Sequence, residues 1–200
     1  MISQFEQLDL NQAYTYADYL SWRFDEMVEV IRGKVFKMSP APNLEHQRVS
    51  GRLFRISSTY LVNKTCEAFH APFDVRLPLP PHLITDDKID TVVQPDICVV
   101  CDPSKLDSQG CLGAPDWIIE ILSPGTAQKD LKEKFEVYEH AGVAEYWIVH
   151  PHEHTLLVYR RNESGRYIGE PRPFVRGDVV PVGVFKDFAI DLNDIFFELA

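Results

Sequence analysis

The segment Pro115-Asp-Trp-Ile-Ile-Glu-Ile-Leu122 decides the fold, because it is an almost continuous apolar run that Glu120 interrupts. A similar run, Pro95-Asp-Ile-Cys-Val-Val-Cys101, precedes it along the chain. Strands that are apolar throughout, instead of alternating, are typical of a sheet covered on both faces. We therefore predict two neighbouring central strands within an α/β (α+β) protein.

Upstream of these strands, the sequence predicts a short helix and then an N-terminal β-hairpin. Thr15 can cap the helix, which we expect to end near Arg23. The β-type runs 27–31 and 34–38 flank an Arg-Gly pair that is suited to a two-residue turn.

A proline-containing break at 39–43 separates this hairpin from a longer predicted helix at 44–62. Apolar residues recur along that helix at the spacing of one buried face. The predicted buried stripe consists of Val49, Leu53, Ile56 and Tyr60.

Downstream of the central strands, the sequence predicts a turn at 123–125, a helix and then further strands. The buried stripe of the helix is predicted to contain Leu131, Phe135 and Tyr138, and a glycine at 142 ends it. A strand at 145–149 follows. A C-terminal hairpin is then predicted between the segment 155–160 and a strand around Tyr167, across a turn at 162–165.

Length and composition indicate one globular domain over residues 1–200, with a core at about 14–198. Hydrophobic residues make up 45% of the chain, which is enough for a sizeable core. The N-terminus lacks the pattern of a signal peptide, and no run of apolar residues is long enough to span a membrane. We therefore expect a cytoplasmic protein without a membrane partner.

The four cysteines of such a protein are expected to be reduced thiols. Cys98 and Cys101 lie three residues apart on a predicted strand, so their side chains should point to opposite faces and should not share a metal ion.

A net charge of -10 argues against a protein that binds nucleic acid over its whole surface. Local basic segments remain compatible with a charged cleft, although the same cations could simply solvate helix faces. These segments contain Arg48, Arg52 and Arg55, and Lys129, Lys132 and Lys134.

Glu120 and Asp96 are the candidate metal-binding residues. A carboxylate inside a buried strand is costly unless a cation, a metal ion or hydrogen bonds compensate it, so Glu120 indicates either a site or a structural ion pair. Asp96 follows a proline, and an aspartate in that position, taken alone, is more often a turn or capping residue than part of a site. Together on adjacent strands, the two carboxylates can share a hard cation such as Mg²⁺.

Lys134 has two interpretations. It can pair with Asp130 four residues earlier as an ordinary exposed helix pair. It also lies beside the predicted buried stripe, from where its long side chain can reach over the sheet towards Glu120.

These motifs resemble the putative restriction endonuclease family of the PD-(D/E)XK nuclease superfamily over most of residues 14–198. The resemblance is carried by Glu29-Val-Ile-x-Gly33, Met38-Ser-Pro-x-Pro42 through His46-Gln47, Val93-Gln-Pro-Asp96, Pro115-Asp-Trp-Ile-Ile-Glu120-Ile-Leu-Ser-Pro124, Asp130-x-x-x-Lys134-x-x-x-Tyr138 and Gly142-Val-x-Glu-Tyr-Trp-Ile-Val149.

The resemblance implies a restriction-endonuclease-like central mixed β-sheet flanked by helices, with Asp96 and Glu120 as metal ligands. In the plain E-x-K motif a lysine would stand at position 122, where this chain has Leu122. The family supplies the lysine from the following helix, which corresponds to Lys134. Glu29 and His46 match further positions that line the same pocket, although a lone histidine is more often a core residue.

The expected activity is metal-dependent phosphodiester hydrolysis of nucleic acid, with DNA favoured. Asp96, Glu120 and the backbone carbonyl of Ile121 would hold Mg²⁺ or Mn²⁺, and Lys134 would orient the attacking water. The alternatives are an inactive binding or assembly module and a metal-dependent hydrolase of small phosphorylated substrates. Cutting both strands of a duplex needs two centres, which favours a homodimer.

Overall fold

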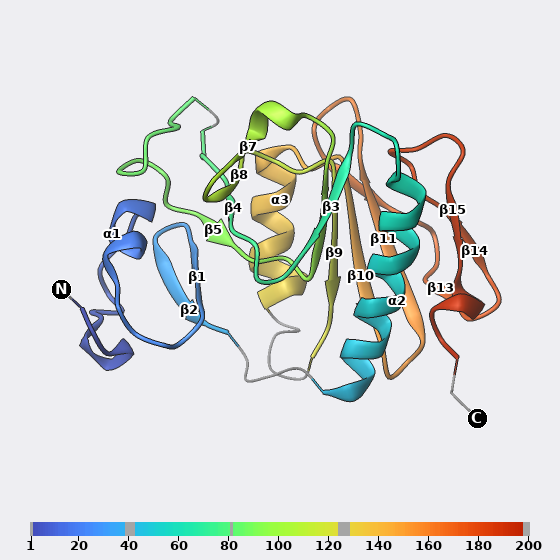
Figure 1. Ribbon diagram of the computed structural model, residues 1–200, viewed down its shortest axis with the longest axis horizontal. Coiled ribbons are helices and arrows are strands. Elements are labelled where there is room, and N and C mark those ends of the chain that lie inside the picture. The colour runs from blue at the N-terminus through green and yellow to red at the C-terminus, as the bar shows by residue number, and fades with distance from the viewer. Residues whose placement is uncertain (1, 39–42, 81, 124–128, 198–200) are drawn as a thin grey trace.

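The computed structural model describes residues 2–38, 43–80, 82–123 and 129–197, with the backbone alone at 129 and 130. In Figure 1 a small N-terminal sheet lies on the left, the central sheet and the longest helices lie in the middle, and a C-terminal hairpin lies on the right. The predicted break at 39–43 and the predicted turn at 123–125 fall largely outside the described residues.

The central sheet contains both predicted core strands, β6 (Ile97–Val100) and β9 (Trp117–Ile121), which pair antiparallel. β9 also pairs in parallel with β10 (Glu145–His150), so the sheet is mixed, as predicted. The strand order is β12-β11-β10-β9-β6-β3, and β13 pairs with β11. The remaining strands of this sheet are β3 (Glu67–His70), β11 (Thr155–Arg161), β12 (Tyr167–Gly169) and β13 (Phe174–Val175).

The first two α-helices form where the sequence predicts them. Thr15 caps α1 (Tyr16–Ser21) through a capping box, which satisfies backbone N–H groups that have no partner inside the helix. Asn43 caps α2 (Leu44–Leu61), whose buried residues include Val49.

The third helical segment differs from its prediction. It begins as a π-helix, η3 (Lys129–Lys134), and continues as α3 (Phe135–Ala141). Tyr138 is buried as predicted, but Leu131 is 42% exposed, so its predicted burial is wrong. An α-helical spacing fails here because the wider π-helical turn changes the direction in which each side chain points. Lys134 is instead turned inwards and is only 3% exposed.

Alternation along the central strands decides which side chains face which helix. Ile119 packs in one core cluster with Val49 of α2. Ile118 packs in a second cluster with Val137 of α3, on the other face of the sheet. Glu120, two residues after Ile118, therefore faces α3 and the π-helix that precedes it.

A second sheet, which the sequence predicts only in part, lies beside the central one. Its order is β2-β1-β5-β4-β8-β7. The predicted hairpin forms its β1–β2 edge, and Arg32 and Gly33 have φ values of 50° and 77° in the turn. The strands are β1 (Val28–Ile31), β2 (Lys34–Lys37), β4 (Val75–Arg76), β5 (Val92–Val93), β7 (Leu106–Asp107) and β8 (Gly110–Leu112).

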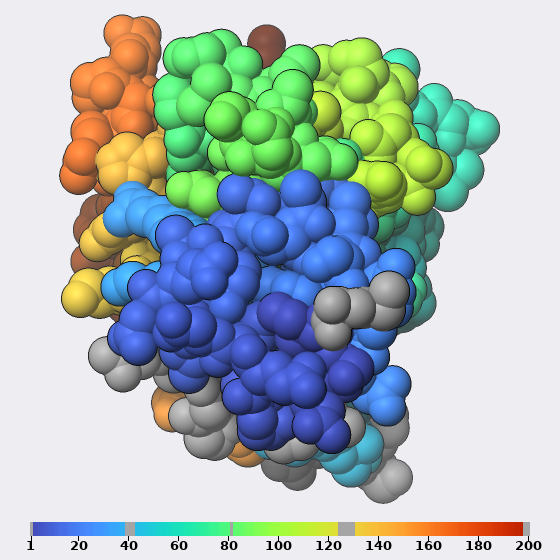
Figure 2. All heavy atoms as spheres, turned by 90° about the vertical axis from the view of Figure 1, so that its left-hand side faces the viewer, coloured from blue at the N-terminus to red at the C-terminus, as the bar shows by residue number. Residues whose placement is uncertain are grey.

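The N-terminal segment covers the outer end of this sheet, as the blue surface in Figure 2 shows. An apolar cluster under it includes Tyr14, Trp22 and Val30. At the other end of the chain, the predicted hairpin β11–β12 is present. The short elements that remain are η1 (Phe5–Gln7), η2 (Pro103–Lys105), β14 (Val179–Pro181), β15 (Ala189–Asp191) and η4 (Leu192–Asp194). Among the described residues, no helix is both long enough and apolar enough to cross a membrane.

The cysteines correct one expectation. Cys66 and Cys101 form a disulfide, whereas Cys98 and Cys111 are buried thiols. The pairing of β3 with β6 brings Cys66 beside Cys101 at the strand ends, a proximity that spacing in the sequence does not reveal. Cys98 and Cys101 do belong to different core clusters on the two faces, as predicted.

Replacing Cys66 with alanine should lower the free energy of unfolding by about 2–4 kcal/mol, because the disulfide restricts the unfolded chain. Urea denaturation without reductant measures this difference. Dithiothreitol should bring the wild type to the stability of the variant and leave the variant unchanged. Equal stability of the two oxidised proteins would contradict a disulfide between Cys66 and Cys101.

Candidate active site

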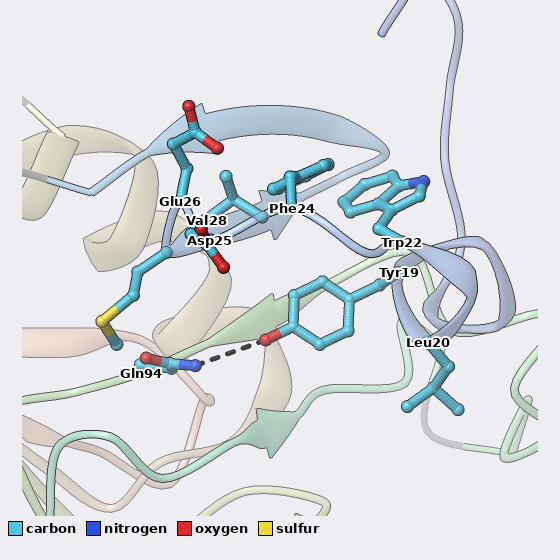
Figure 3. A pocket seen from close by; sticks show the side chains of 9 residues that line it. Tyr19, Leu20, Trp22, Phe24, Asp25, Glu26, Val28 and Gln94 are labelled. Atoms are coloured by element: carbon cyan, nitrogen blue, oxygen red, sulfur yellow. Dashed lines mark hydrogen bonds between the residues drawn. The ribbon is translucent and has the colours of Figure 1, made fainter. Parts of the chain in front are cut away.

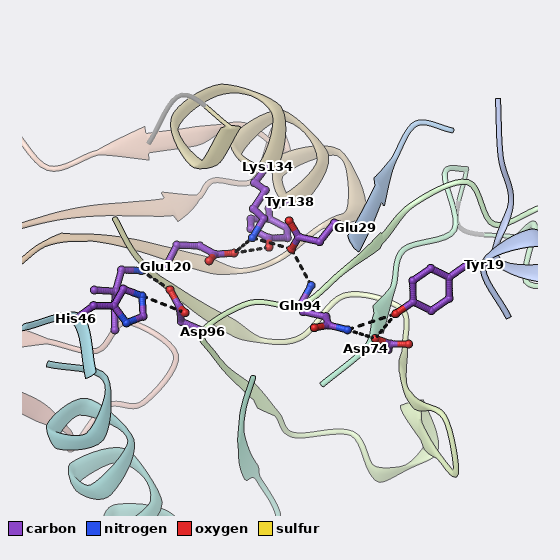
Figure 4. Close-up of polar contacts among 10 residues, drawn as sticks. Tyr19, Glu29, His46, Asp74, Gln94, Asp96, Glu120, Lys134 and Tyr138 are labelled. Carbon is purple, nitrogen blue, oxygen red and sulfur yellow. Dashed lines mark hydrogen bonds and ion pairs between the residues drawn. The ribbon is translucent and has the colours of Figure 1, made fainter. Parts of the chain in front are cut away.

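Lys134 connects two carboxylates at the junction of the two sheets. Its Nζ lies 2.9 Å from Oε1 of Glu29 and 2.8 Å from Oε1 of Glu120. All three side chains are almost fully buried, with at most 4% of the side chain exposed. Figure 4 shows them converging from β1, β9 and the π-helix. A buried lysine between carboxylates is a strong electrostatic arrangement, because each charge compensates the loss of water around the others.

Tyr138 holds Glu120 from the same side. Its hydroxyl donates a 2.7 Å hydrogen bond to Glu120 Oε1, the oxygen that also contacts Lys134. Burial, followed by the negative charge of Glu120, raises the pKa of the Tyr138 phenol well above its usual range. The phenol therefore stays protonated and acts as a hydrogen-bond donor that fixes the position of the carboxylate.

Asp96 lies at the end of the neighbouring strand, opposite Glu120 in the register that pairs Ile97 with Ile119. Its Oδ2 accepts a 2.7 Å hydrogen bond from the backbone N–H of Ile121. Its Oδ1 lies 3.3 Å from Nε2 of His46, which comes from the first turn of α2. Asp96 is the more accessible of the two strand-end carboxylates, with 21% of its side chain exposed.

The residues that the sequence singles out therefore form two adjoining sets of contacts, joined where Asp96 accepts from the backbone of Ile121, the residue after Glu120. Lys134 contacts Glu29 and Glu120, and His46 contacts Asp96. Lys134 is also the cation that the structural ion-pair interpretation of Glu120 requires. The side chain of the other proposed partner of Lys134, the aspartate at position 130, lies outside the described residues.

The basic segments do not act as one group. Arg52 is buried, donates to the carbonyl of Ile195 over 2.7 Å and lies 3.6 Å from the centre of the Phe197 ring. It therefore holds the C-terminal segment against α2. Arg55 and Lys132 are exposed, which is compatible with the solvated-face interpretation.

Sequence reasoning missed a polar network next to Glu29. The backbone N–H of Gln94 donates to Glu29 Oε1 over 2.9 Å, and its side-chain amide donates to Asp74 Oδ1 over 2.8 Å. The hydroxyl of Tyr19 also lies 3.3 Å from Asp74 Oδ1. The position of Gln94 two residues before Asp96 was the available signal, whereas Asp74 and Tyr19 lie in segments that carry no motif.

Asp74 should make stability depend on pH. Burial raises the pKa of Asp74 above 3.8, although hydrogen bonds from Gln94 and Tyr19 oppose that effect. The folded protein therefore holds this proton more tightly than the unfolded chain, and stability falls as the pH rises from 3.8 through the folded-state pKa. In thermal melts recorded over a series of pH values, the melting temperature of Asp74→Asn should not show this decline.

Asp178 provides the matched control for Asp74. Arg172 and the N–H of Val175 lower the pKa of Asp178 to about 2, so its contribution is present above 3.8 and is lost as the pH falls towards 2. Asp178→Asn should therefore remove a loss of melting temperature that the wild type shows as the pH falls, whereas Asp74→Asn removes one that appears as the pH rises. The same pH profile for Asp74→Asn and the wild type would contradict the assignment.

Comparison with known proteins identifies the family. Residues 16–193 match the model of the Uma2 family, described as putative restriction endonuclease. This chain belongs to the Uma2 family. An uncharacterized protein of Synechocystis sp. is 25% identical over 154 residues, which is 76% of each chain. The Uma2 chain is also similar in fold to a crystal structure of a putative nuclease belonging to DUF820 from Anabaena variabilis, with a TM-score of 0.68 and 22% identity over 92% of this chain and 97% of that one.

The donor chemistry of this Uma2 site suits a hard divalent cation. Asp96 and Glu120 offer carboxylate oxygens, and Ile121 between the strand ends offers a backbone carbonyl. Mg²⁺ and Mn²⁺ prefer oxygen ligands, and Mg²⁺ is commonly held by one or two carboxylates while it keeps several waters. No group of three or more His, Cys, Asp or Glu side chains in the described part of the chain is arranged to hold a metal.

Proposed function

We propose that this Uma2-family chain is a metal-dependent endonuclease that hydrolyses phosphodiester bonds, with DNA as its polymer. The observation that carries the proposal is that the strand register places Asp96 opposite Glu120 on neighbouring strands, with Lys134 in contact with Glu120. The family description supports the same class of reaction. The whole chain would act as one nuclease-like unit in the cytoplasm.

Asp96, Glu120 and the carbonyl of Ile121 would hold Mg²⁺ or Mn²⁺. When bound, such an ion supplies Lewis-acid stabilisation of phosphate charge and lowers the pKa of a bound water. Lys134 would orient the attacking water and stabilise negative charge in the transition state. His46, at 3.3 Å from Asp96, would keep that carboxylate in position.

Geometry also constrains how the chain would meet a duplex. One chain contains one such centre within its described residues, and cleavage of both strands requires two. We therefore propose a homodimer in which each protomer cuts one strand. A net charge of -10 opposes a broad electrostatic footprint, so contact with the phosphates would be confined to the surroundings of the site.

A non-catalytic module is the second candidate, because Lys134 pairs with Glu29 and Glu120 as a purely structural ion pair also would. Metal titration separates the two. A working site gains melting temperature with Mn²⁺ by mass action, whereas a retained ion pair does not. Asp96→Ala should abolish the gain because it removes one of the two carboxylate ligands.

The test of activity is incubation of the purified protein with supercoiled, linear and single-stranded DNA, RNA and free nucleotides, with Mn²⁺ or with EDTA. Mn²⁺-dependent cleavage of DNA supports the proposal. Hydrolysis of nucleotides alone, with all polymers intact, would favour a small-substrate hydrolase. Intact substrates throughout, with Asp96→Ala indistinguishable from the wild type, would contradict any nuclease.

A further inference from the structure

A pocket of about 360 Å³ lies next to the candidate active site and has no part in the chemistry described above. Aromatic side chains, carboxylates and an amide surround it, as Figure 3 shows. Its volume is within the range of small-ligand sites. The lining residues are Tyr19, Leu20, Trp22, Phe24, Asp25, Glu26, Met27, Val28 and Gln94.

The aromatic part of the wall can hold a flat ring. Tyr19 and Phe24 are only partly buried, and each packs against Trp22 behind them. Trp22 and Phe24 are stacked at an interplanar angle of 24°, so neither ring is free to collapse into the space. Partly exposed aromatic faces of this kind bind flat π-systems such as nucleobases by stacking.

Gln94 is an independent sign of a ligand. It is 8% exposed, and its Nε2 donates to Tyr19 and Asp74. Its Oε1 is buried and accepts no hydrogen bond from the part of the chain that the structure describes. A buried acceptor without a donor is costly in a folded protein, so this oxygen calls for a donor from a ligand or an ordered water.

Two further polar side chains of the pocket, Asp25 and Glu26, can only accept hydrogen bonds when they are ionised. Asp25 is exposed and Glu26 is partly buried at the same pocket, and both are carboxylates. Such a set repels a phosphate and prefers a neutral ligand that donates hydrogen bonds. Adenine, cytosine and guanine carry an exocyclic amino group, whereas thymine and uracil do not.

A single carboxylate oxygen joins this pocket to the candidate active site. Glu29 Oε1 accepts from the backbone N–H of Gln94 and contacts Lys134 Nζ, each over 2.9 Å. Figure 4 shows Gln94 and Tyr19 continuing from Glu29 and Lys134. The pocket residue Gln94 is therefore linked to Lys134 of the candidate site through one side chain, Glu29.

We propose that the pocket binds an unpaired, amino-bearing nucleobase of the substrate strand next to the bond that is cut. The base stacks on Tyr19 and Phe24 and donates hydrogen bonds to Gln94 Oε1 and the carboxylate of Asp25. This inference rests on the proposed nuclease function for its substrate. It implies that single-stranded or locally opened DNA is preferred over an intact duplex, because a paired base cannot enter.

Binding of fluorescein-labelled short oligo-dC and oligo-dU, measured by anisotropy with Ca²⁺ in place of Mn²⁺, tests the proposal. Oligo-dC should bind the wild type about tenfold more tightly than oligo-dU, because only cytosine has the amino donor. Phe24→Ala should weaken oligo-dC binding about tenfold by loss of stacking. Because Phe24→Ala could also lower stability, a second variant is needed. Asp25→Asn is an exposed and nearly isosteric change, and it should reduce the preference for oligo-dC over oligo-dU.

The controls are Phe174→Ala, a partly buried phenylalanine of β13, and Glu163→Gln, an exposed carboxylate at the β11–β12 turn. Both should bind as the wild type does. Equal binding of dC and dU, no binding of either, or unchanged binding by Phe24→Ala and Asp25→Asn would overturn the pocket assignment. This test can fail independently of the nuclease proposal. Binding that depends on the pocket, without Mn²⁺-dependent cleavage, contradicts only the nuclease proposal. Cleavage without binding that depends on the pocket contradicts only the pocket proposal.

Discussion

Replacing Lys134 with methionine should lower the free energy of unfolding by about 3–5 kcal/mol. The change removes the ammonium that lies within 2.9 Å of both Glu29 and Glu120. Two almost fully buried carboxylates then face each other without this cation, which is much more costly than the loss of an exposed pair. Urea denaturation at neutral pH measures the effect.

The physical cause can be isolated with a second substitution. Glu29→Gln combined with Lys134→Met removes one of the two opposing charges, and it should recover at least about 1 kcal/mol of the loss.

Lys88→Met is the matched control, because Lys88 pairs with Asp87 over 3.5 Å with both side chains more than half exposed. It should change the free energy of unfolding by less than about 1 kcal/mol. If Lys134→Met were as mild as Lys88→Met, the buried charge network would not have the energetic role inferred from its geometry.

Glu120→Gln should reduce kcat/KM for DNA cleavage with Mn²⁺ by at least about 100-fold, while the protein remains folded. The amide keeps the size of the carboxylate but loses the charge that would hold the metal ion, and metal catalysis commonly supplies several kcal/mol. Lys134 retains Glu29 as a partner, so the fold should tolerate the change. Initial rates and a thermal melt on the same preparation measure both effects.

Tyr138→Phe tests how much the positioning of Glu120 contributes, because it leaves the charge of Glu120 unchanged. It removes only the 2.7 Å hydrogen bond to Glu120 Oε1 and should cost about tenfold in kcat/KM. A Glu120→Gln variant as active as the wild type would contradict a catalytic role for the buried carboxylate and would leave the structural ion pair as its explanation.

Much of the fold could be predicted because the local signals agree with the tertiary structure. The apolar runs around β6 and β9 mark strands covered on both faces, and the Arg32-Gly33 turn marks the β1–β2 hairpin. The failure at Leu131 arises because the prediction assumed an α-helical period, whereas the chain adopts a π-helix there. That same geometry turns Lys134 into the site.

The candidate site was predictable where a residue contradicts its surroundings. Glu120 is a charge within a buried strand, so its importance is visible without the structure. Asp74 and Tyr19 belong to no motif, and Gln94 is visible in the sequence only through its place two residues before Asp96. The pairing of β1, β4 and β5 brings the three residues together. The Cys66–Cys101 disulfide was missed for the same reason, since it depends on the pairing of β3 with β6.

The initial rate of DNA strand cleavage as a function of Mn²⁺ concentration is the most direct test of the central claim that Asp96 and Glu120 hold a catalytic metal ion. The account predicts no cleavage in EDTA, saturable activation of the wild type and a largely abolished response in Asp96→Asn. Asp178→Asn, a carboxylate change in the C-terminal region, should follow the wild-type curve. Cleavage that persists in EDTA, an absence of cleavage at every Mn²⁺ concentration, or an unchanged Mn²⁺ response in Asp96→Asn would contradict it.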